Sequence, residues 1–193
     1  YEIRPRDWSS DVCSSDLSFD IMLIRAIMLG MKSYNQEYLR STMFGIENSL
    51  ISTVGLIAGM TIGTSDKNVV VLGAVVAIAI ELLAMGIGEY LSDDAVQELD
   101  KIKRHPDNPL LSGALMTASG TVAGLVPLLP VIFLSYPYSL ITSILAALFV
   151  LFMVGYIKGR VLHSKPILGG LKIMTIGGMA TALGVLVGLI FRI

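Results

Sequence analysis

The sequence predicts an all-α integral membrane protein with five transmembrane helices. Of its 193 residues, 54% are hydrophobic and only 15% charged, with a mean hydropathy of +0.75. An ordinary soluble domain has about a quarter of its residues charged. Five stretches also reach the roughly 20 mainly apolar residues that a spanning helix needs. These stretches are 43–63, 69–91, 111–134, 139–157 and 173–191. They leave no room for a separate soluble domain, and the net charge of −1 argues against a nucleic-acid partner.

The first residues do not resemble a natural protein segment. Residues 7–17 read as an in-frame translation of a common sequencing-library adapter, and residues 1–3 fit its upstream part. We therefore expect residues 1–17 to be an adapter artefact and exclude them from the fold; a native polar tail is the alternative. The only cysteine, Cys13, and the only tryptophan, Trp8, lie there. No disulfide or thiol chemistry is expected in the rest of the chain.

Residues 18–42 mix apolar side chains with Arg25, Lys32 and Glu37. This pattern favours an interfacial amphipathic helix that leads into the first span, and a disordered leader is the alternative. Residues 43–193 then form the five-helix transmembrane domain.

Glycines recur at every fourth position of the first span, at Gly55, Gly59 and Gly63. Such a stripe lets helix backbones approach closely. We favour tight packing within one bundle over a dimer seam. Shorter stripes occur in the third span (Gly120, Gly124) and in the last span (Gly184, Gly188).

Basic residues gather before the first span, between spans two and three, and between spans four and five. The positive-inside rule then places the N-terminus in the cytoplasm and the C-terminus outside. The loop 92–110 is polar and cytoplasmic on this topology. Its acidic residues are expected to be solvated, and collection of cations is the alternative.

Pro127 and Pro130 are expected to interrupt the third span, because each removes a backbone donor and frees a carbonyl. The interruption is either a simple structural kink or a bend that widens a path beside the carboxylate-bearing helices.

Glu81, Met85 and Glu89 share one face of the second span, since positions i, i+4 and i+8 of a helix lie together. A charge in the hydrocarbon costs at least about 2.5 kcal/mol, so an intramembrane carboxylate indicates a functional site. Two hard oxygen ligands and a soft thioether suit a divalent transition metal. No Lys or Arg lies deep in any predicted span to pair with these carboxylates, so they are also candidate proton carriers. The alternatives are core filling for Met85 and a structural hydrogen bond for either Glu.

Glu47 and Asn48 add a candidate oxygen site in the first span. Neighbouring helical residues point about 100° apart, so only one of the two is expected to face the pathway. Ser49 and Ser52 receive little weight, because Ser in a span more often bonds its own backbone. No phosphate-binding loop or nucleophile–His pairing is present. Neither an enzyme nor an ATP-driven pump is therefore expected.

Several motifs fall in order along the spans. Residues 38–59, with Arg40-Ser-Thr-Met-Phe44-Gly45 followed by Glu47 and Asn48, are similar to the pattern Arg-x3-Phe-Gly-x-x-Asp-Gly-Leu-Val-Ser. Ala84-Met-Gly-Ile-Gly-Glu-Tyr-Leu-Ser92 is similar to Ser-Met-Ala-x-Gly-Glu-Tyr-x-Ser. With the paired prolines and the glycine-rich last span, the chain resembles the vacuolar iron transporter family, also called nodulin-21-like, over about residues 40–191.

This resemblance implies a five-span homodimer that exports Fe²⁺, often also Mn²⁺, from the cytoplasm in exchange for protons. The metal path would run between the subunits, lined by the first and second spans. Fe²⁺ and Mn²⁺ would be transported substrates, and no permanently bound cofactor is implied. Met85 and Glu89 match family positions directly. The membrane would be the cell membrane in a prokaryote and the vacuolar membrane in a eukaryote.

Two departures from the family pattern affect function. The first-span Asp of the family falls at Asn48, which can ligate a metal but cannot carry a proton. Proton coupling at this position is therefore expected only if Glu47 takes over that role. Many members also insert a Glu-rich metal-binding domain after the second span, where this chain has only residues 92–110. The alternatives to metal export are a membrane scaffold or sensor that kept the fold without transport, and a transporter of another cation or a small solute.

Overall fold

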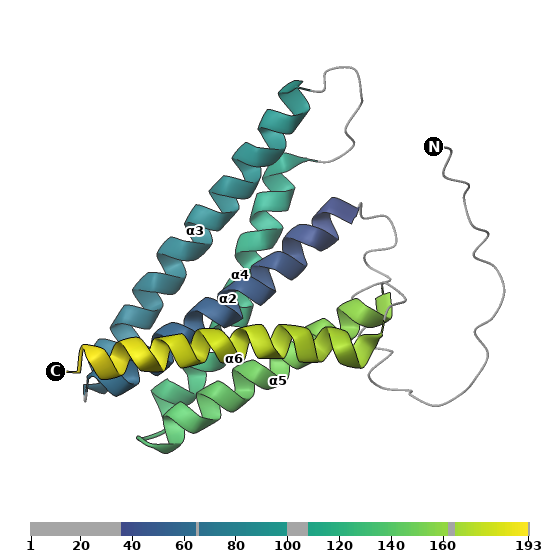
Figure 1. Cartoon of the computed structure of the whole chain (residues 1–193). Helices are drawn as coiled ribbons and strands as arrows, with labels where there is room; N and C mark the ends of the chain where they lie inside the picture. The colour runs from purple at the N-terminus through teal and green to yellow at the C-terminus, as the bar shows by residue number, and fades with distance from the viewer. Residues whose placement is uncertain (1–35, 65, 100–107, 162–164, 193) are drawn as a thin grey trace. The chain divides into compact units, whose positions relative to one another are not determined.

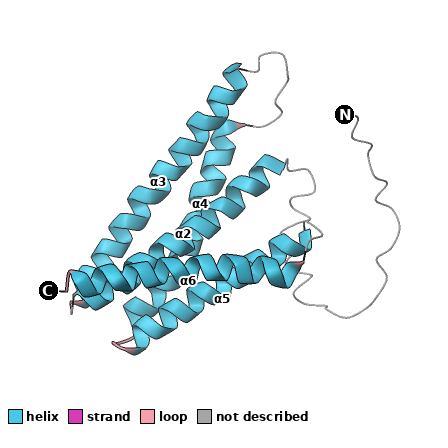
Figure 2. Cartoon of the chain, in the orientation of Figure 1, coloured by secondary structure: helices cyan, strands magenta, loops and turns pink. Residues whose placement is uncertain are grey.

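The computed structural model describes residues 36–64, 66–99, 108–161 and 165–192. Every regular element in these ranges is an α-helix (Figure 2). The helices are α2 (Gln36–Gly63), α3 (Lys67–Leu99), α4 (Pro109–Phe133), α5 (Tyr138–Val161) and α6 (Pro166–Ile190). All five are long and apolar enough to cross a membrane by length and composition. The prediction of an all-α protein with five such helices is confirmed.

The helices extend further than the apolar stretches indicated. The first helix begins at Gln36, so residues 36–42 belong to it and not to a separate amphipathic segment. The last begins at Pro166 and not at residue 173, because a proline is well tolerated in the first turn of a helix. Lys172 therefore lies inside α6 and is exposed; a lysine side chain is long enough to extend its amine from such a position to a membrane surface. The expectations for residues 1–17 and 18–35 fall outside the described residues.

The second helix is the longest, with 33 residues. At 1.5 Å per residue it extends about 50 Å, well beyond a hydrocarbon core of about 30 Å. The first part of the predicted loop 92–110 is therefore helix as far as Leu99. This corrects the assignment of that part to a loop; residues 100–107 lie outside the described part of the chain.

Helix α2 lies between two helix pairs, α3 with α4 and α5 with α6 (Figure 1). It contacts all four of the other described helices, whereas α3 contacts neither α5 nor α6 over the described residues. Two apolar clusters hold this arrangement together. Ile57 packs with residues of α3 and α4, among them Ile78 and Leu128. Leu50 and Val54 pack with residues of α4, α5 and α6, among them Leu151.

The glycine stripe of α2 packs against the glycine stripe of α6 in the same chain. A Cβ atom added at Gly59 would lie 2.7 Å from the Gly184 carbonyl oxygen. A Cβ atom added at Gly184 would lie 2.0 Å from the Gly55 carbonyl oxygen. Both distances are shorter than real contacts allow, so the two backbones touch without room for a side chain. The favoured prediction, packing within one bundle, is confirmed for this stripe.

The expectation that Pro127 and Pro130 interrupt the third span is wrong. Helix α4 continues through both residues to Phe133. Pro127 is fully buried, and its carbonyl accepts a hydrogen bond of 2.5 Å from the Ser143 hydroxyl on α5. This bond ties α5 to α4 beside the proline. A role of the two prolines in widening a path stays a prediction.

Candidate metal-binding site

Three of the predicted site residues meet between α2 and α3. The Asn48 amide nitrogen donates to Glu81 Oε1 at 2.7 Å and lies 3.0 Å from Met85 Sδ. Glu81 and Met85 face α2 because they are one turn apart on the same side of α3. All three residues are partly buried. One helix thus supplies a carboxylate and a thioether, and the other supplies an amide directed at both.

Ser52 completes the hydrogen bonding of Glu81. Its hydroxyl donates to Glu81 Oε2 at 2.7 Å and lies 3.3 Å from the Ser49 carbonyl oxygen. The shorter contact is to the carboxylate, so Ser52 is oriented toward Glu81 as well as toward its own backbone. Sequence reasoning gave it too little weight. Ser49, in contrast, donates to the Gly120 carbonyl at 2.8 Å and ties α2 to α4.

Glu89 lies two turns further along α3, against the beginning of α2. Its Oε1 atom accepts a short hydrogen bond from the Ser41 hydroxyl and lies 3.1 Å from Arg40 Nη2. Asp93 Oδ1 lies 3.8 Å from the same arginine nitrogen. The Glu89 side chain is 10% exposed and that of Arg40 is 60% exposed. The expectation that these carboxylates lack a basic partner is therefore wrong for Glu89.

Glu47 faces away from this site. Its Oε1 atom accepts a hydrogen bond of 3.0 Å from Lys158 Nζ on α5. Adjacent residues of α2 therefore point to different neighbours, Glu47 to α5 and Asn48 to α3. Only Asn48 of the two faces Glu81, and the expectation that a single one of them faces the pathway stays a prediction. A metal-binding role for Glu47 stays a prediction, and its ion pair with Lys158 was not foreseen from the sequence.

The donor atoms form an incomplete metal shell in one chain. Within the described ranges, no three His, Cys, Asp or Glu side chains lie close enough together to hold a metal ion. The Asn48 amide nitrogen lies between Glu81 and Met85, where a shared cation would also have to lie. A half-turn of the amide would present its oxygen in place of the nitrogen. The single chain could then offer a carboxylate, an amide oxygen and a thioether.

Sequence reasoning missed Arg40, Ser41 and Lys158. Ser41, Asn48 and Ser52 are spaced by seven and four residues and so share one face of α2. That spacing was a usable signal for Ser41. Nothing comparable existed for Arg40 and Lys158, because they reach their carboxylates from helix ends through long side chains.

The fold and the site define a helical membrane protein with polar and sulfur-bearing side chains gathered between two of its spanning helices. The model of the VIT family matches residues 39–105 and 93–189. Together these ranges cover most of the chain, which belongs to the VIT family.

Curated relatives carry related names. Vacuolar iron transporter 1 of Tulipa gesneriana is 38% identical over 86 residues, which is 44% of this chain and 35% of the relative. Vacuolar iron transporter 1 of Oryza sativa subsp. japonica is 36% identical over 86 residues, or 34% of its own length. Vacuolar iron transporter homolog 1 of Arabidopsis thaliana is 25% identical over 158 residues, covering 76% of this chain and 78% of the relative. The chain spans about a third of the length of the first two.

Proposed function

We propose that this chain is a membrane transporter that exports Fe²⁺, and also Mn²⁺, from the cytoplasm in exchange for protons. The observation that carries the proposal is the meeting of Asn48, Glu81 and Met85 between α2 and α3. Membership of the VIT family and the relatives named vacuolar iron transporters support iron as the substrate. By those names, a vacuolar membrane is the proposed location.

The donor set supports a borderline metal over Mg²⁺ or Ca²⁺, which prefer oxygen alone. A thioether favours a softer ion, whereas carboxylate and amide oxygens keep the site suitable for Mn²⁺. We propose that an arriving ion displaces the Asn48 amide nitrogen from Glu81 and Met85 and binds the amide oxygen instead. Each lost hydrogen bond is then replaced by a metal–ligand contact.

Proton exchange requires groups that can lose and regain a proton, which Asn48 cannot do. Glu81 and Glu89 are the proposed carriers, since both are partly buried on the α3 face that contacts α2. Ser52 and Ser41 contact them through hydroxyls, which both donate and accept hydrogen bonds. Glu89, near Asp93 in the C-terminal part of α3, is the proposed cytoplasmic entry.

A homodimer is proposed because the site lacks ligands in one chain and opens toward a groove. This groove, of about 710 Å³, is lined almost wholly by apolar residues of α2 and α6. Asn48 and Ser52 belong to its lining. A second copy seated along α2 would cover apolar surface and could bring its own Asn48 and Met85 toward the first set.

The first experiment measures uptake of Fe²⁺ and of Mn²⁺ into proteoliposomes of the full chain under an imposed pH gradient, with a pH dye inside. Metal entry with proton exit is expected. Glu81→Gln should lower metal uptake by at least about tenfold, since even weaker changes around a metal site cost that much. Glu98→Gln, an exposed Glu on the same helix, is the matched control and should transport normally. Metal entry without proton movement would refute exchange, and no entry by folded protein would refute transport.

A second candidate is a membrane scaffold or sensor that kept the fold without transport. It is favoured by one observation: the Asn48 amide is a neutral group that donates a hydrogen bond directly to Glu81 and so satisfies the carboxylate oxygen within the protein. Asn48→Asp separates the candidates, because two facing carboxylates repel one another unless a proton or a cation lies between them. If the wild type is a transporter, Asn48→Asp changes the rate or coupling of existing transport. Transport that appears only in Asn48→Asp would support the scaffold reading.

A further inference from the structure

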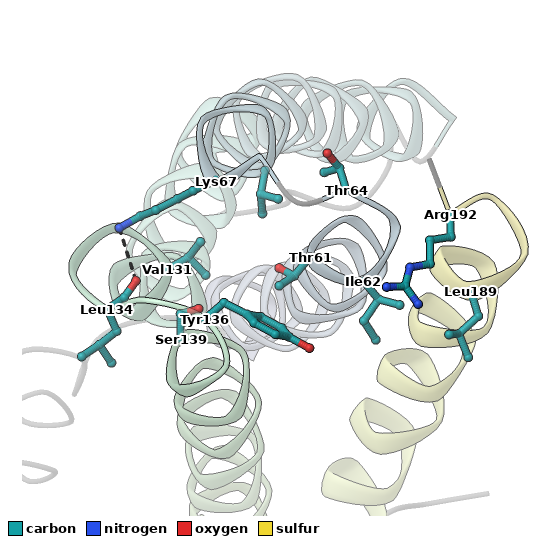
Figure 3. A pocket seen from close by; sticks show the side chains of 11 residues that line it. Thr61, Ile62, Thr64, Lys67, Val131, Leu134, Tyr136, Ser139, Leu189 and Arg192 are labelled. Carbon is teal, nitrogen blue, oxygen red and sulfur yellow. Dashed lines mark hydrogen bonds between the residues drawn. The ribbon is translucent and has the colours of Figure 1, made fainter.

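A cavity lies at the end of the bundle where α3 begins, away from the metal-binding residues. It has a volume of about 400 Å³ and is lined from all five helix ends and the turn between α4 and α5 (Figure 3). Small-molecule sites commonly fall between about 300 and 1,000 Å³. None of the residues that carry the proposed metal chemistry lines it. The cavity is therefore a separate site in the described part of the molecule.

The lining has the composition of an anion site. Two of its side chains are cationic, Lys67 and Arg192, and none of the described lining residues is acidic. Asp66 is close in sequence, but its carboxylate accepts from the Asn68 backbone N–H at 2.9 Å and it is not part of the lining. Hydroxyl groups supply further donors, from Thr61, Thr64, Tyr136 and Ser139. A bare divalent cation would be repelled here, whereas an oxyanion would be attracted.

The two cations have different roles. Lys67 Nζ donates to the carbonyls of Ile132 at 2.7 Å and Leu134 at 3.3 Å, so it is oriented to the end of α4. Figure 3 shows Arg192 reaching from the end of α6 toward Ile62 and the cavity. A guanidinium can bind a phosphate or carboxylate through two parallel hydrogen bonds. Arg192 is therefore the principal anchor for an anion, and Lys67 adds positive charge from the opposite side of the cavity (Figure 3).

Thr61 provides an independent indication. Its hydroxyl oxygen is buried and has no hydrogen-bond partner, and it is the only cavity-lining group in this condition among the described residues. A buried polar group without a partner is costly, and such groups often mark an absent ligand or water. Rotation of the Thr61 side chain about χ1 would turn this hydroxyl toward a bound oxyanion, which would then accept a hydrogen bond from it.

We propose that this cavity binds a small oxyanion, a phosphate or carboxylate group, through Arg192 with the Thr61 hydroxyl. Because the cavity lies at one end of the spanning helices, the group can belong to a free anion or to a lipid headgroup. One consequence rests on the proposed function: a bound oxyanion would offset the positive charge of Lys67 and Arg192 and so reduce the repulsion of a departing divalent cation.

The test measures binding without metal or transport, so its failure is distinguishable from failure of the proposed function. The full chain in a neutral detergent is titrated calorimetrically with inorganic phosphate and separately with citrate. Saturable binding is expected, and Arg192→Gln should weaken it by about tenfold or more, as for loss of a charged hydrogen-bond donor. Lys165→Gln, an exposed basic residue at the opposite end of the same helix region, is the matched control and should bind as wild type.

Two further measurements complete the test. Native mass spectrometry from phosphatidylglycerol-containing micelles counts the lipid molecules that the protein retains. If the wild type retains lipid, Arg192→Gln does not, and neither binds free anions, the ligand is a lipid headgroup. Thr61→Val should weaken binding of the same ligand several-fold and leave the melting temperature unchanged. Loss of a hydroxyl with only a structural role would lower the melting temperature instead. No Arg192-dependent binding of phosphate, citrate or lipid, or an equal loss in Lys165→Gln, would overturn the proposal.

Discussion

At the scale of single residues, Glu89 is the carboxylate whose surroundings differ most from a bare charge in the membrane. It lies between the Ser41 hydroxyl and the Arg40 guanidinium at the beginning of α2. Arg40 is largely exposed, so its attraction for Glu89 is screened by solvent and contributes little to stability by itself. The contact therefore has more importance for the position of Glu89 than for the stability of the fold.

Glu89→Gln should abolish metal transport while the protein remains inserted and dimeric. Glutamine keeps the size and can still accept hydrogen bonds from Ser41 and Arg40, but it can neither hold a proton nor carry charge. Transport is measured in proteoliposomes, and dimerisation by size-exclusion chromatography with light scattering.

Asp93→Asn is the matched control, since Asp93 also lies near Arg40, at 3.8 Å. It should keep most of its transport. If both variants lose transport equally, charge balance around Arg40 is the relevant property and Glu89 has no separate role. Full transport by Glu89→Gln would remove Glu89 from the mechanism.

At the scale of helices, the contact between α2 and α6 depends on the absence of side chains. Gly55 and Gly59 touch the backbone of Gly184, and Gly59 touches that of Gly188. In a membrane such close approach is a main source of helix association, because lipid is as apolar as the side chains it would replace. The α2–α6 contact should therefore be sensitive to a single methyl group.

Gly184→Ala should destabilise the protein by about 1–3 kcal/mol, the usual cost of overpacking. The added Cβ would lie 2.0 Å from the Gly55 carbonyl oxygen, a contact with backbone that cannot easily move. Gly178→Ala on the same helix is the control, since a Cβ there meets nothing within 4 Å. It should be neutral or stabilise by up to about 1 kcal/mol through helix propensity. The measurement is denaturant unfolding in mixed micelles, and equal behaviour of the two variants would contradict the packing argument.

The sequence was sufficient for the helices and for part of the site. Continuous apolar stretches predicted all five spans, but not their ends, because polar residues such as Lys172 and Asp93 continue a helix beyond the hydrocarbon. The i, i+4 spacing placed Glu81 and Met85 on one face of α3. It could not show that Asn48 lies opposite them, since the register between two helices depends on packing. The ion pair of Glu47 with Lys158, 111 residues apart, was equally inaccessible.

At the scale of the whole molecule, α2 is in contact with every other described helix, yet one side of it is open. The groove along α2 and α6 is apolar and includes Asn48 at its lining. Exposed apolar residues on α3 and α5 are expected of any membrane protein and need no partner other than lipid. The groove differs because it adjoins the polar site, which is why the proposed second copy belongs there.

Cross-linking tests this arrangement. In a Cys13→Ser background, Ile51→Cys introduces a thiol in the groove one turn from Asn48. A short bis-maleimide should then produce covalent dimers from protein in liposomes. Leu145→Cys is the control, since Leu145 is 61% exposed on α5 outside the groove. Cross-linking at both positions alike, or only at Leu145, would contradict a dimer formed along α2.

The interlocked glycines of α2 and α6 also restrict how the molecule can move. The contacting glycines are spaced four residues apart on each helix. If one helix slid along the other, a larger side chain would meet the facing backbone. Glycine would face glycine again only after about one full turn, roughly 5.4 Å. The two helices therefore translate together. Helix α3 has no such lock to α6, and within the described residues it does not touch it. A change of access at Asn48 and Glu81 would thus require a movement other than the sliding of α2 along α6.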